Sequence, residues 1–175
     1  MRAMSEAHTF SVLERLRDGR QIEIRALELS DREALLAAAR RTSDQSLYRR
    51  FFALRREFSD AEVESFVTVD FVDQVALVAV MPEDGREIIA GGGRYIVTGP
   101  GAAELAFTVV DEFQGQGIAS ALLRHLADLA RAAGLRRFLA EVLPGNTAML
   151  RVLEHSGLRM QQRRESGVVH ISLQL

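Results

Sequence analysis

The most informative stretch of this sequence is Val109-Val110-Asp111-Glu112-Phe113-Gln114-Gly115-Gln116-Gly117-Ile118-Ala119-Ser120. An apolar strand expected over residues 103–110 leads into it, and Ile118 begins a long amphipathic helix that ends at Gly134. The first turn of a helix leaves about four backbone N–H groups unpaired and carries a partial positive charge. Because the glycines of the turn let an anion approach these groups, the stretch predicts a pyrophosphate-binding loop.

Two other interpretations of this turn remain open. It is compatible with a glycine-rich connection that binds nothing, and also with a dinucleotide fingerprint, because Gly115-Gln116-Gly117 begins a G-x-G pattern and Glu141 ends the next strand. The fingerprint requires Gly or Ala at its last position, where Ser120 stands, and too little chain follows for a second mononucleotide-binding half. The phosphate-binding loop is therefore the preferred interpretation.

The rest of the chain predicts one mixed α/β (α+β) domain. We expect helices at 31–41, 45–54, 60–67, 118–133 and 147–155, and strands at 21–26, 74–81, 87–97, 103–110, 137–143, 158–164 and 168–173. Gly91-Gly92-Gly93 is expected to interrupt the strand at 87–97. This order predicts a mostly antiparallel sheet of six to seven strands with helices on both faces. The domain is expected over residues 19–175, after an N-terminal extension at 1–18.

Composition excludes several classes of function. The chain of 175 residues has 22 basic residues, all of them arginine, against 24 acidic ones, and this balance gives no sign of a nucleic-acid partner. It has no cysteine, and its four histidines lie far apart, so neither a disulfide nor a metal site is expected. We also expect no membrane partner and a cytoplasmic location, because no signal peptide or long apolar run is found.

Two segments resemble the motifs of the GNAT family of N-acetyltransferases. Gln114-Gly115-Gln116-Gly117-Ile118-Ala119 matches the family's coenzyme-A loop, (Arg/Gln)-x-x-Gly-x-(Gly/Ala), and residues 146–158 resemble its second motif, an Asn that opens a helix closed by Gly and an apolar residue. Further segments resemble the catalytic domains of bacterial Pat-type protein-lysine acetyltransferases: Asp18-Gly19-Arg20, Ser46-Leu47-Tyr48-Arg49-Arg50-Phe51-Phe52, residues 75–80 and residues 140–144. The resemblance implies a GNAT-like domain with acetyl-CoA as cosubstrate and an amine, such as a protein lysine, as acceptor.

The resemblance also implies which residues hold acetyl-CoA. The pantetheine arm would pair with the strand that carries Phe107, Val109, Val110 and Asp111. The pyrophosphate would lie on the loop formed by Gln114, Gly115, Gln116, Gly117, Ile118, Ala119 and Ser120. Asn146 would reach the pantetheine or the reacting region, although an Asn at that position also suits a simple helix N-cap.

Acetyl transfer to an amine requires a base. A lysine has a pKa of about 10.4, so its deprotonation at pH 7 costs about 4.6 kcal/mol, and a nearby carboxylate can take the proton. Glu104 is the first candidate, because it interrupts the apolar segment at 102–107 and because Pat-type enzymes resemble this segment with a base at that Glu. Glu141 is the second. The alternative for each is a carboxylate that simply faces solvent.

Leu153 stands where many family members have a tyrosine that protonates the departing thiolate. A coenzyme-A sensor without turnover therefore remains an alternative, as does a small-molecule amine acetyltransferase. The oligomeric state is expected to be a monomer or a homodimer.

An acidic run indicates a cationic acceptor. Between residues 57 and 85 the chain has eight acidic residues and no base: Glu57, Asp60, Glu62, Glu64, Asp70, Asp73, Glu83 and Asp84. The helices after the first strand commonly border the acceptor groove in this fold, so these residues predict an acidic rim that attracts a lysine within a basic stretch. The alternative is a solvated helix face and a turn.

Overall fold

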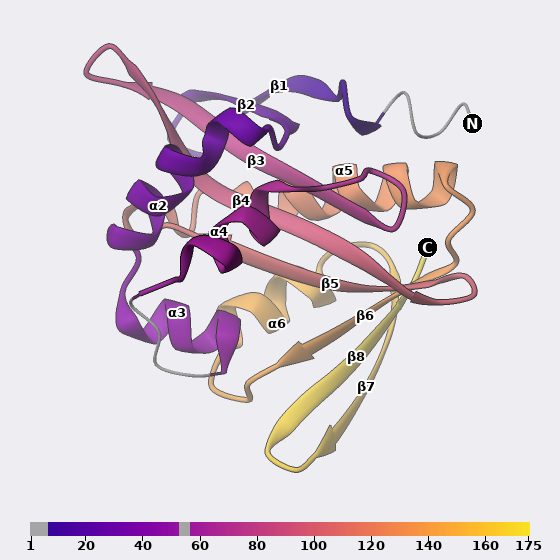
Figure 1. Cartoon of the computed structure of the whole chain (residues 1–175). Coiled ribbons are helices and arrows are strands. Elements are labelled where there is room, and N and C mark those ends of the chain that lie inside the picture. Colours follow the sequence, from indigo (N-terminus) through magenta and orange to yellow (C-terminus); the bar gives the residue numbers. More distant parts are fainter. Residues whose placement is uncertain (1–6, 53–56) are drawn as a thin grey trace.

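The computed structural model describes residues 7–52 and 57–175, and it shows one mixed sheet with helices on both faces (Figure 1). The sheet has eight strands in the order β1-β2-β3-β4-β5-β6-β8-β7. Every neighbouring pair is antiparallel except β5 and β6, which are parallel. The strands are β1 (Ser11–Arg15), β2 (Gln21–Ala26), β3 (Gln74–Glu83), β4 (Arg86–Gly99), β5 (Ala102–Val109), β6 (Arg137–Val142), β7 (Arg159–Glu165) and β8 (Val168–Gln174).

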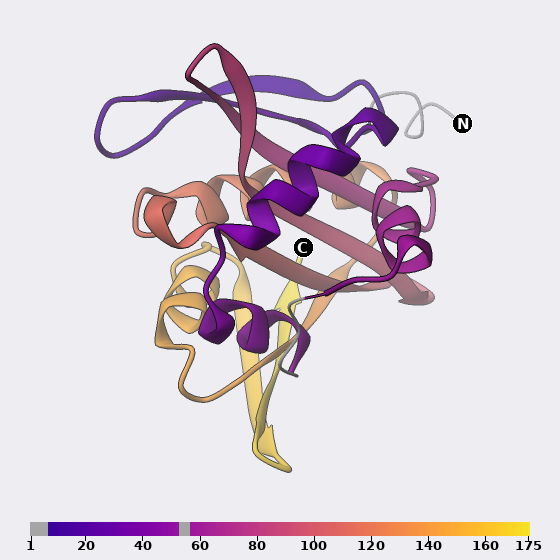
Figure 2. The ribbon, with the colours of Figure 1, turned by 60° about the vertical axis from the view of Figure 1, so that its left-hand side comes forward.

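Helices cover the two faces of the sheet unequally. The longest, α5 (Ile118–Ala132), lies along one face and buries Ile118, Leu122 and Leu126 against β3, β4 and β5. Three shorter helices cover the other face, as Figure 2 shows: α2 (Arg32–Arg40), α3 (Asp44–Phe51) and α4 (Asp60–Val67). The last helix, α6 (Thr147–Glu154), follows β6. The central strand β3 is apolar on both faces because both are covered.

Strand β4 continues through its three glycines, but its pairing with β3 shifts by one residue at Ala90, directly before Gly91, so the predicted interruption is a β-bulge and not a break in the strand. A Cβ atom on Gly91 would lie 3.0 Å from Ile118 Cγ2, and one on Gly93 would lie 2.6 Å from the ring of Phe107. The glycines therefore do not break the strand. They let α5 and the Phe107 ring lie directly on its backbone.

The first strand was not expected. Ser11–Arg15 forms the edge strand β1 and pairs with β2, so part of the segment expected as an extension belongs to the sheet. A hydrogen bond of 2.6 Å joins His125 Nε2 of α5 to Glu14 Oε1 of β1, and Arg124 pairs with the same carboxylate. These contacts fasten β1 to the helix that covers the sheet.

The two parallel strands pair only over a short length. Their register runs from Ala102↔Arg137 to Glu104↔Leu139 and then stops. Beyond this point β5 continues to Val109 beside β4, whereas β6 continues beside β8. The sheet therefore opens between β5 and β6. In the part of the chain that the structure describes, no helix is long and apolar enough to span a membrane.

We expect Gly93→Ala to lower the free energy of unfolding by about 1–3 kcal/mol, because the added methyl group overpacks the contact between β4 and the Phe107 ring. Gly99→Ala is the control, since a Cβ atom there meets nothing within 4 Å. Urea unfolding of both variants measures the difference. Equal stability of the two variants would contradict the proposed role of Gly93.

Candidate active site

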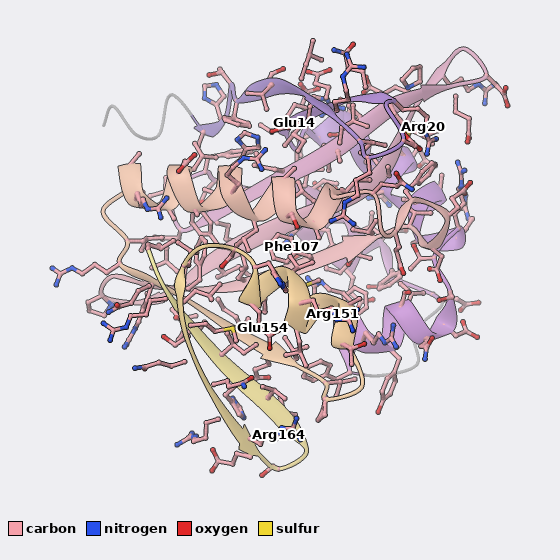
Figure 3. The ribbon with its side chains drawn as sticks, turned by 180° about the vertical axis from the view of Figure 1, so that it is seen from behind. Glu14, Arg20, Phe107, Arg151, Glu154 and Arg164 are labelled. Carbon is pink, nitrogen blue, oxygen red and sulfur yellow. The ribbon has the colours of Figure 1, made fainter. Side chains whose placement is uncertain are left out.

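The opening between β5 and β6 forms a cleft of about 550 Å³. Its walls come from β5, β6, α3, α6 and the loop that precedes α5. Seen from behind in Figure 3, Phe107 of β5 lies between α5 and α6, and Arg151 lies on α6. The cleft is thus a gap in the sheet itself, with the start of a long helix at one side.

Gly117 begins α5 in a conformation that suits glycine. Its φ is +95°, in the left-handed region that L-residues rarely adopt. The first intrahelical hydrogen bond that follows is donated by Ala121 N to Gly117 O at 3.0 Å. The backbone N–H groups of Ile118, Ala119 and Ser120 therefore precede the regular helix pattern, and all three residues line the cleft. This arrangement can hold an anion such as a pyrophosphate.

Side chains of the loop fix it to α3. Gln114 Nε2 donates to Val109 O at 3.0 Å and to Ser46 Oγ at 3.1 Å. Asp111 Oδ1 accepts from the backbone N–H of Ser43 at 2.8 Å. Burial by itself would raise the pKa of Asp111, but the hydrogen bonds from Ser43 and Ser46 outweigh it and hold that pKa below its usual value. The loop is therefore held in place from the opposite side of the sheet.

A second cavity lies on the other side of β5, under α2, α3 and α4. It measures about 140 Å³, and its lining is mostly apolar, including the rings of Phe51, Phe58 and Phe66. Of the residues that the structure describes, three line both this cavity and the cleft: Arg50, Ala106 and Thr108. The two cavities therefore meet across β5.

The two candidate carboxylates lie on one face of the sheet, close to this junction. Glu104 is on the same face of β5 as Ala106 and Thr108, since side chains alternate along a strand. Glu104 also opposes Leu139, the last β6 partner of β5, and Glu141 follows two residues later on the same face of β6. Glu141 lines the cleft, whereas Glu104 lies just outside the lining of both cavities. A cleft with helix N–H groups that can hold an anion, with Glu141 in its lining and Glu104 nearby on the same face of the sheet, suits a thioester donor and an amine acceptor.

Residues 21–159 match the family model described as the acetyltransferase (GNAT) domain. The chain belongs to the GNAT family.

Individual relatives agree with this assignment. The chain is 35% identical over 138 residues to an acetyltransferase of Pseudomonas aeruginosa, a match that covers 78% of this chain and 74% of that protein. It is also 35% identical over 156 residues to acetyltransferase Pat of Mycolicibacterium smegmatis, which covers 88% of this chain but only 46% of Pat. The solved GNAT domain of S. lividans PAT is 38% identical, with a TM-score of 0.85 over 94% of this chain and 97% of that one. This GNAT protein is an acetyl-CoA-dependent acyltransferase.

Most of the residues predicted to hold acetyl-CoA line the cleft. They are Phe107, Val109, Gln114, Gly115, Gly117, Ile118, Ala119, Ser120 and Asn146. Asn146 also caps α6, because its Oδ1 accepts from Met149 N at 3.2 Å. Three others lie elsewhere: Val110 is buried and lines the second cavity, Asp111 holds α3, and Gln116 Oε1 accepts from Asp18 N at 3.2 Å. The side chains of these three residues therefore shape the loop and do not line the cleft.

Arg17 lines the cleft from the turn between β1 and β2, and sequence reasoning missed it. Its Nη1 donates to Gly115 O at 3.1 Å, and its backbone N–H donates to Gln116 O at 3.2 Å. The guanidinium group thus adds positive charge beside the helix N-terminus. Arg49 and Arg151 also line the cleft. No local pattern marks Arg17, because its contacts with Gly115 and Gln116 lie far away in the sequence.

Leu153 is buried and lines the cleft at the position where a tyrosine is common in the family. Neither tyrosine of the chain replaces it: Tyr95 is buried against Phe138, and Tyr48 does not line the cleft. The group that protonates the leaving thiolate is therefore not a tyrosine side chain among the described lining residues.

The acidic run is largely engaged in other contacts. Asp60 and Glu64 pair with Arg32, Glu83 pairs with Arg41, Glu62 caps the start of α4, and Asp70 accepts three backbone N–H groups. Arg32 and Arg41 offset part of this negative charge, whereas the backbone N–H groups leave Glu62 and Asp70 charged, so the acidic rim stays a prediction.

We expect Gly117→Glu to abolish stabilisation by acetyl-CoA, because it places bulk and negative charge where the loop would hold the pyrophosphate. For the unchanged protein at a ligand concentration 100 times its Kd, stabilisation is about 2.7 kcal/mol, or roughly 5–10 °C in Tm. Thermal unfolding with and without acetyl-CoA measures the shift in each variant.

Gly134→Glu is the matched control for this prediction. Gly134 also has a left-handed φ, of +84°, but it lies at the other end of α5. The Gly134→Glu substitution adds the same charge and the same backbone strain, and it should leave the Tm shift with acetyl-CoA intact. A normal shift in Gly117→Glu would refute the loop assignment.

Proposed function

We propose that this GNAT enzyme transfers the acetyl group of acetyl-CoA to the side-chain amine of a protein lysine, with Glu104 as the general base. The observation that carries the proposal is the junction of the two cavities at Ala106 and Thr108, beside Glu104. The donor would reach this point through the cleft and the acceptor from the side of α2–α4. Similarity to acetyltransferase Pat and to the GNAT domain of S. lividans PAT supports a lysine acceptor.

The cleft fits the donor. Among the described residues, no strand pairs with the edge of β5 that faces β6 after Glu104. This edge can offer backbone groups to the amides of a pantetheine arm, apart from Val109 O, which accepts from Gln114 Nε2. The N–H groups of Ile118, Ala119 and Ser120, together with the Arg17 guanidinium group, suit a pyrophosphate.

Acetyl transfer would form one bond, break another and release one proton. When bound, acetyl-CoA would supply a thioester. Its carbonyl carbon would form a bond to the amine nitrogen as the C–S bond breaks. The sulfur would keep the bonding electrons and end as the thiol. The chain provides the base that removes the amine proton, and the backbone that holds the reacting groups in place. Starting from an ammonium group, the overall products are the amide, the coenzyme-A thiol and one proton.

Glu104 is preferred to Glu141 as the base because its charge acts on Arg50, which lines both cavities. Glu141 lies toward His170 of β8, with 3.6 Å between Oε1 and Nδ1. A carboxylate next to the junction can take a proton from the acceptor side, directly or through a water molecule.

A small-molecule amine is the second candidate acceptor. The observation that favours it is the size and apolar lining of the second cavity, together with the engaged acidic run. The cytoplasmic location, the absence of a metal and the oligomeric state stay predictions.

We expect Glu104→Gln to lower the rate of acetyl transfer on the order of 10²-fold at pH 7, because the shape is kept and the base is lost. The loss should shrink at high pH, where more of the amine is neutral. Binding of acetyl-CoA, measured by thermal shift, should be unchanged. If Glu141→Gln shows this profile and Glu104→Gln does not, the two roles are exchanged.

Isotope-labelled acetyl-CoA and a cell lysate identify the acceptor. We expect label on lysine side chains of a limited set of proteins when the fractions are analysed by mass spectrometry. Label confined to small molecules would favour the second candidate. Loss of all labelling with Gly117→Glu is the control for enzymatic transfer. Intact acetyl-CoA under all conditions would instead indicate a coenzyme-A sensor.

A further inference from the structure

Arg50 is the charged residue at the junction of the two cavities. It comes from α3, it is half-buried, and it lines the cleft and the second cavity together with Ala106 and Thr108. Its guanidinium group lies over the neighbouring Phe51 ring, 4.8 Å from the centroid. Arg50 forms no ion pair with any residue in the described ranges 7–52 and 57–175. A cation therefore stands where an acceptor amine would have to arrive.

A second arginine reinforces this charge. Arg94 of β4 opposes Ala106 of β5, donates from Nη2 to Phe66 O at 2.7 Å, and lines the second cavity. Among the described residues that line this cavity, Arg50 and Arg94 carry the only charges, and both are positive. The cavity is thus apolar and electropositive.

The titration behaviour of the two arginines agrees with this geometry. Burial lowers the pKa of Arg50, and the charge of Glu104 opposes that effect only in part. Burial, followed by repulsion from Arg50, lowers the pKa of Arg94 to about 10. Positive charge is therefore already unfavourable at the junction, before any substrate amine is added.

The other charged or titratable groups around Arg50 lie in the cleft or next to the junction. Glu104 of β5 and Glu141 of β6 are the acidic ones. The basic side chains that line the cleft are Arg17, Arg49 and Arg151, His155 lines it from the end of α6, and Arg94 approaches from β4. Among the described residues that line the cleft, basic side chains outnumber carboxylates.

We propose that Arg50, supported by Arg94, activates the acceptor by disfavouring its ammonium form, so that the neutral amine is present at the junction and Glu104 receives the proton. The inference rests on the proposed function and adds to it the means by which the amine becomes a nucleophile. A lysine amine that is desolvated or placed beside another cation loses its proton more readily. This reduces the work left for the base.

The absence of lysine from the chain makes the effect directly measurable. Ala106→Lys introduces the only lysine at the junction, and its pKa is read from the single resonance of ¹³C-labelled lysine as the pH changes. Gln162→Lys, on the exposed strand β7, is the reference. We expect the lysine introduced at position 106 to titrate at least about one pKa unit below the reference, and adding Arg50→Gln to raise its pKa by about one unit.

Two further variants complete this measurement. Arg164 is an exposed arginine of β7, and adding Arg164→Gln should leave the pKa of the lysine at position 106 unchanged. Thr108→Lys places the lysine at the other shared position if Ala106→Lys does not fold. If the introduced lysine titrates alike with and without Arg50, the inference is wrong.

Kinetics give an independent test on a lysine peptide acceptor from the lysate experiment. Arg50→Gln should move the pH of half-maximal kcat/KM to higher values and slow the reaction at pH 7, whereas Arg164→Gln should not. Replacing the acceptor lysine by thialysine, whose amine is less basic, should recover much of the lost rate. A purely structural role for Arg50 predicts a uniform loss at every pH and no recovery.

The two tests separate this inference from the proposed function. A low pKa for the introduced lysine without any lysine acetylation would keep the role of Arg50 and refute the lysine acceptor. Acetylation of protein lysines, together with an unchanged pKa of the introduced lysine and an unchanged pH profile of kcat/KM in Arg50→Gln, would support the lysine acceptor and refute the role of Arg50.

Discussion

The short parallel pairing of β5 and β6 is the constraint on which the rest of this structure depends. Parallel strands cannot be joined by a tight turn and require a crossover, here α5. The crossover helix begins where β5 ends, so its positive N-terminus lies beside the strand at the side where β6 leaves it. One topological feature therefore opens the sheet, exposes the β5 backbone and delivers an anion-binding helix end to the same cleft.

Contacts across β5 join the donor side to the acceptor side. Gln114 and Asp111 of the loop bind Ser46 and Ser43, which lie at the start of α3. The same helix carries Arg50 to the junction of the two cavities. The loop proposed to hold the pyrophosphate therefore contacts the helix that carries Arg50.

The exclusive use of arginine has a chemical consequence in such a protein. A lysine at the junction would lose its charge when buried, and it would itself be an acceptor for the acetyl group. Arginine stays charged under the same burial and does not compete as a nucleophile. Arg50 and Arg94 can thus keep an apolar cavity electropositive, a condition that favours a neutral amine beside Glu104.

The sequence by itself determined the glycine-rich loop before α5, the helix from Ile118 and most of the strands, because these depend on glycine, caps and apolar spacing within a few residues. It did not reveal β1, whose residues alternate between exposed and half-buried positions, or that β4 continues past the shift in pairing at Ala90. Nor could it place Arg17 beside Gly115, Arg32 beside Asp60 or Arg50 between two cavities. Strand register and helix packing bring these partners together, and such contacts between distant segments leave no periodic signal in the chain.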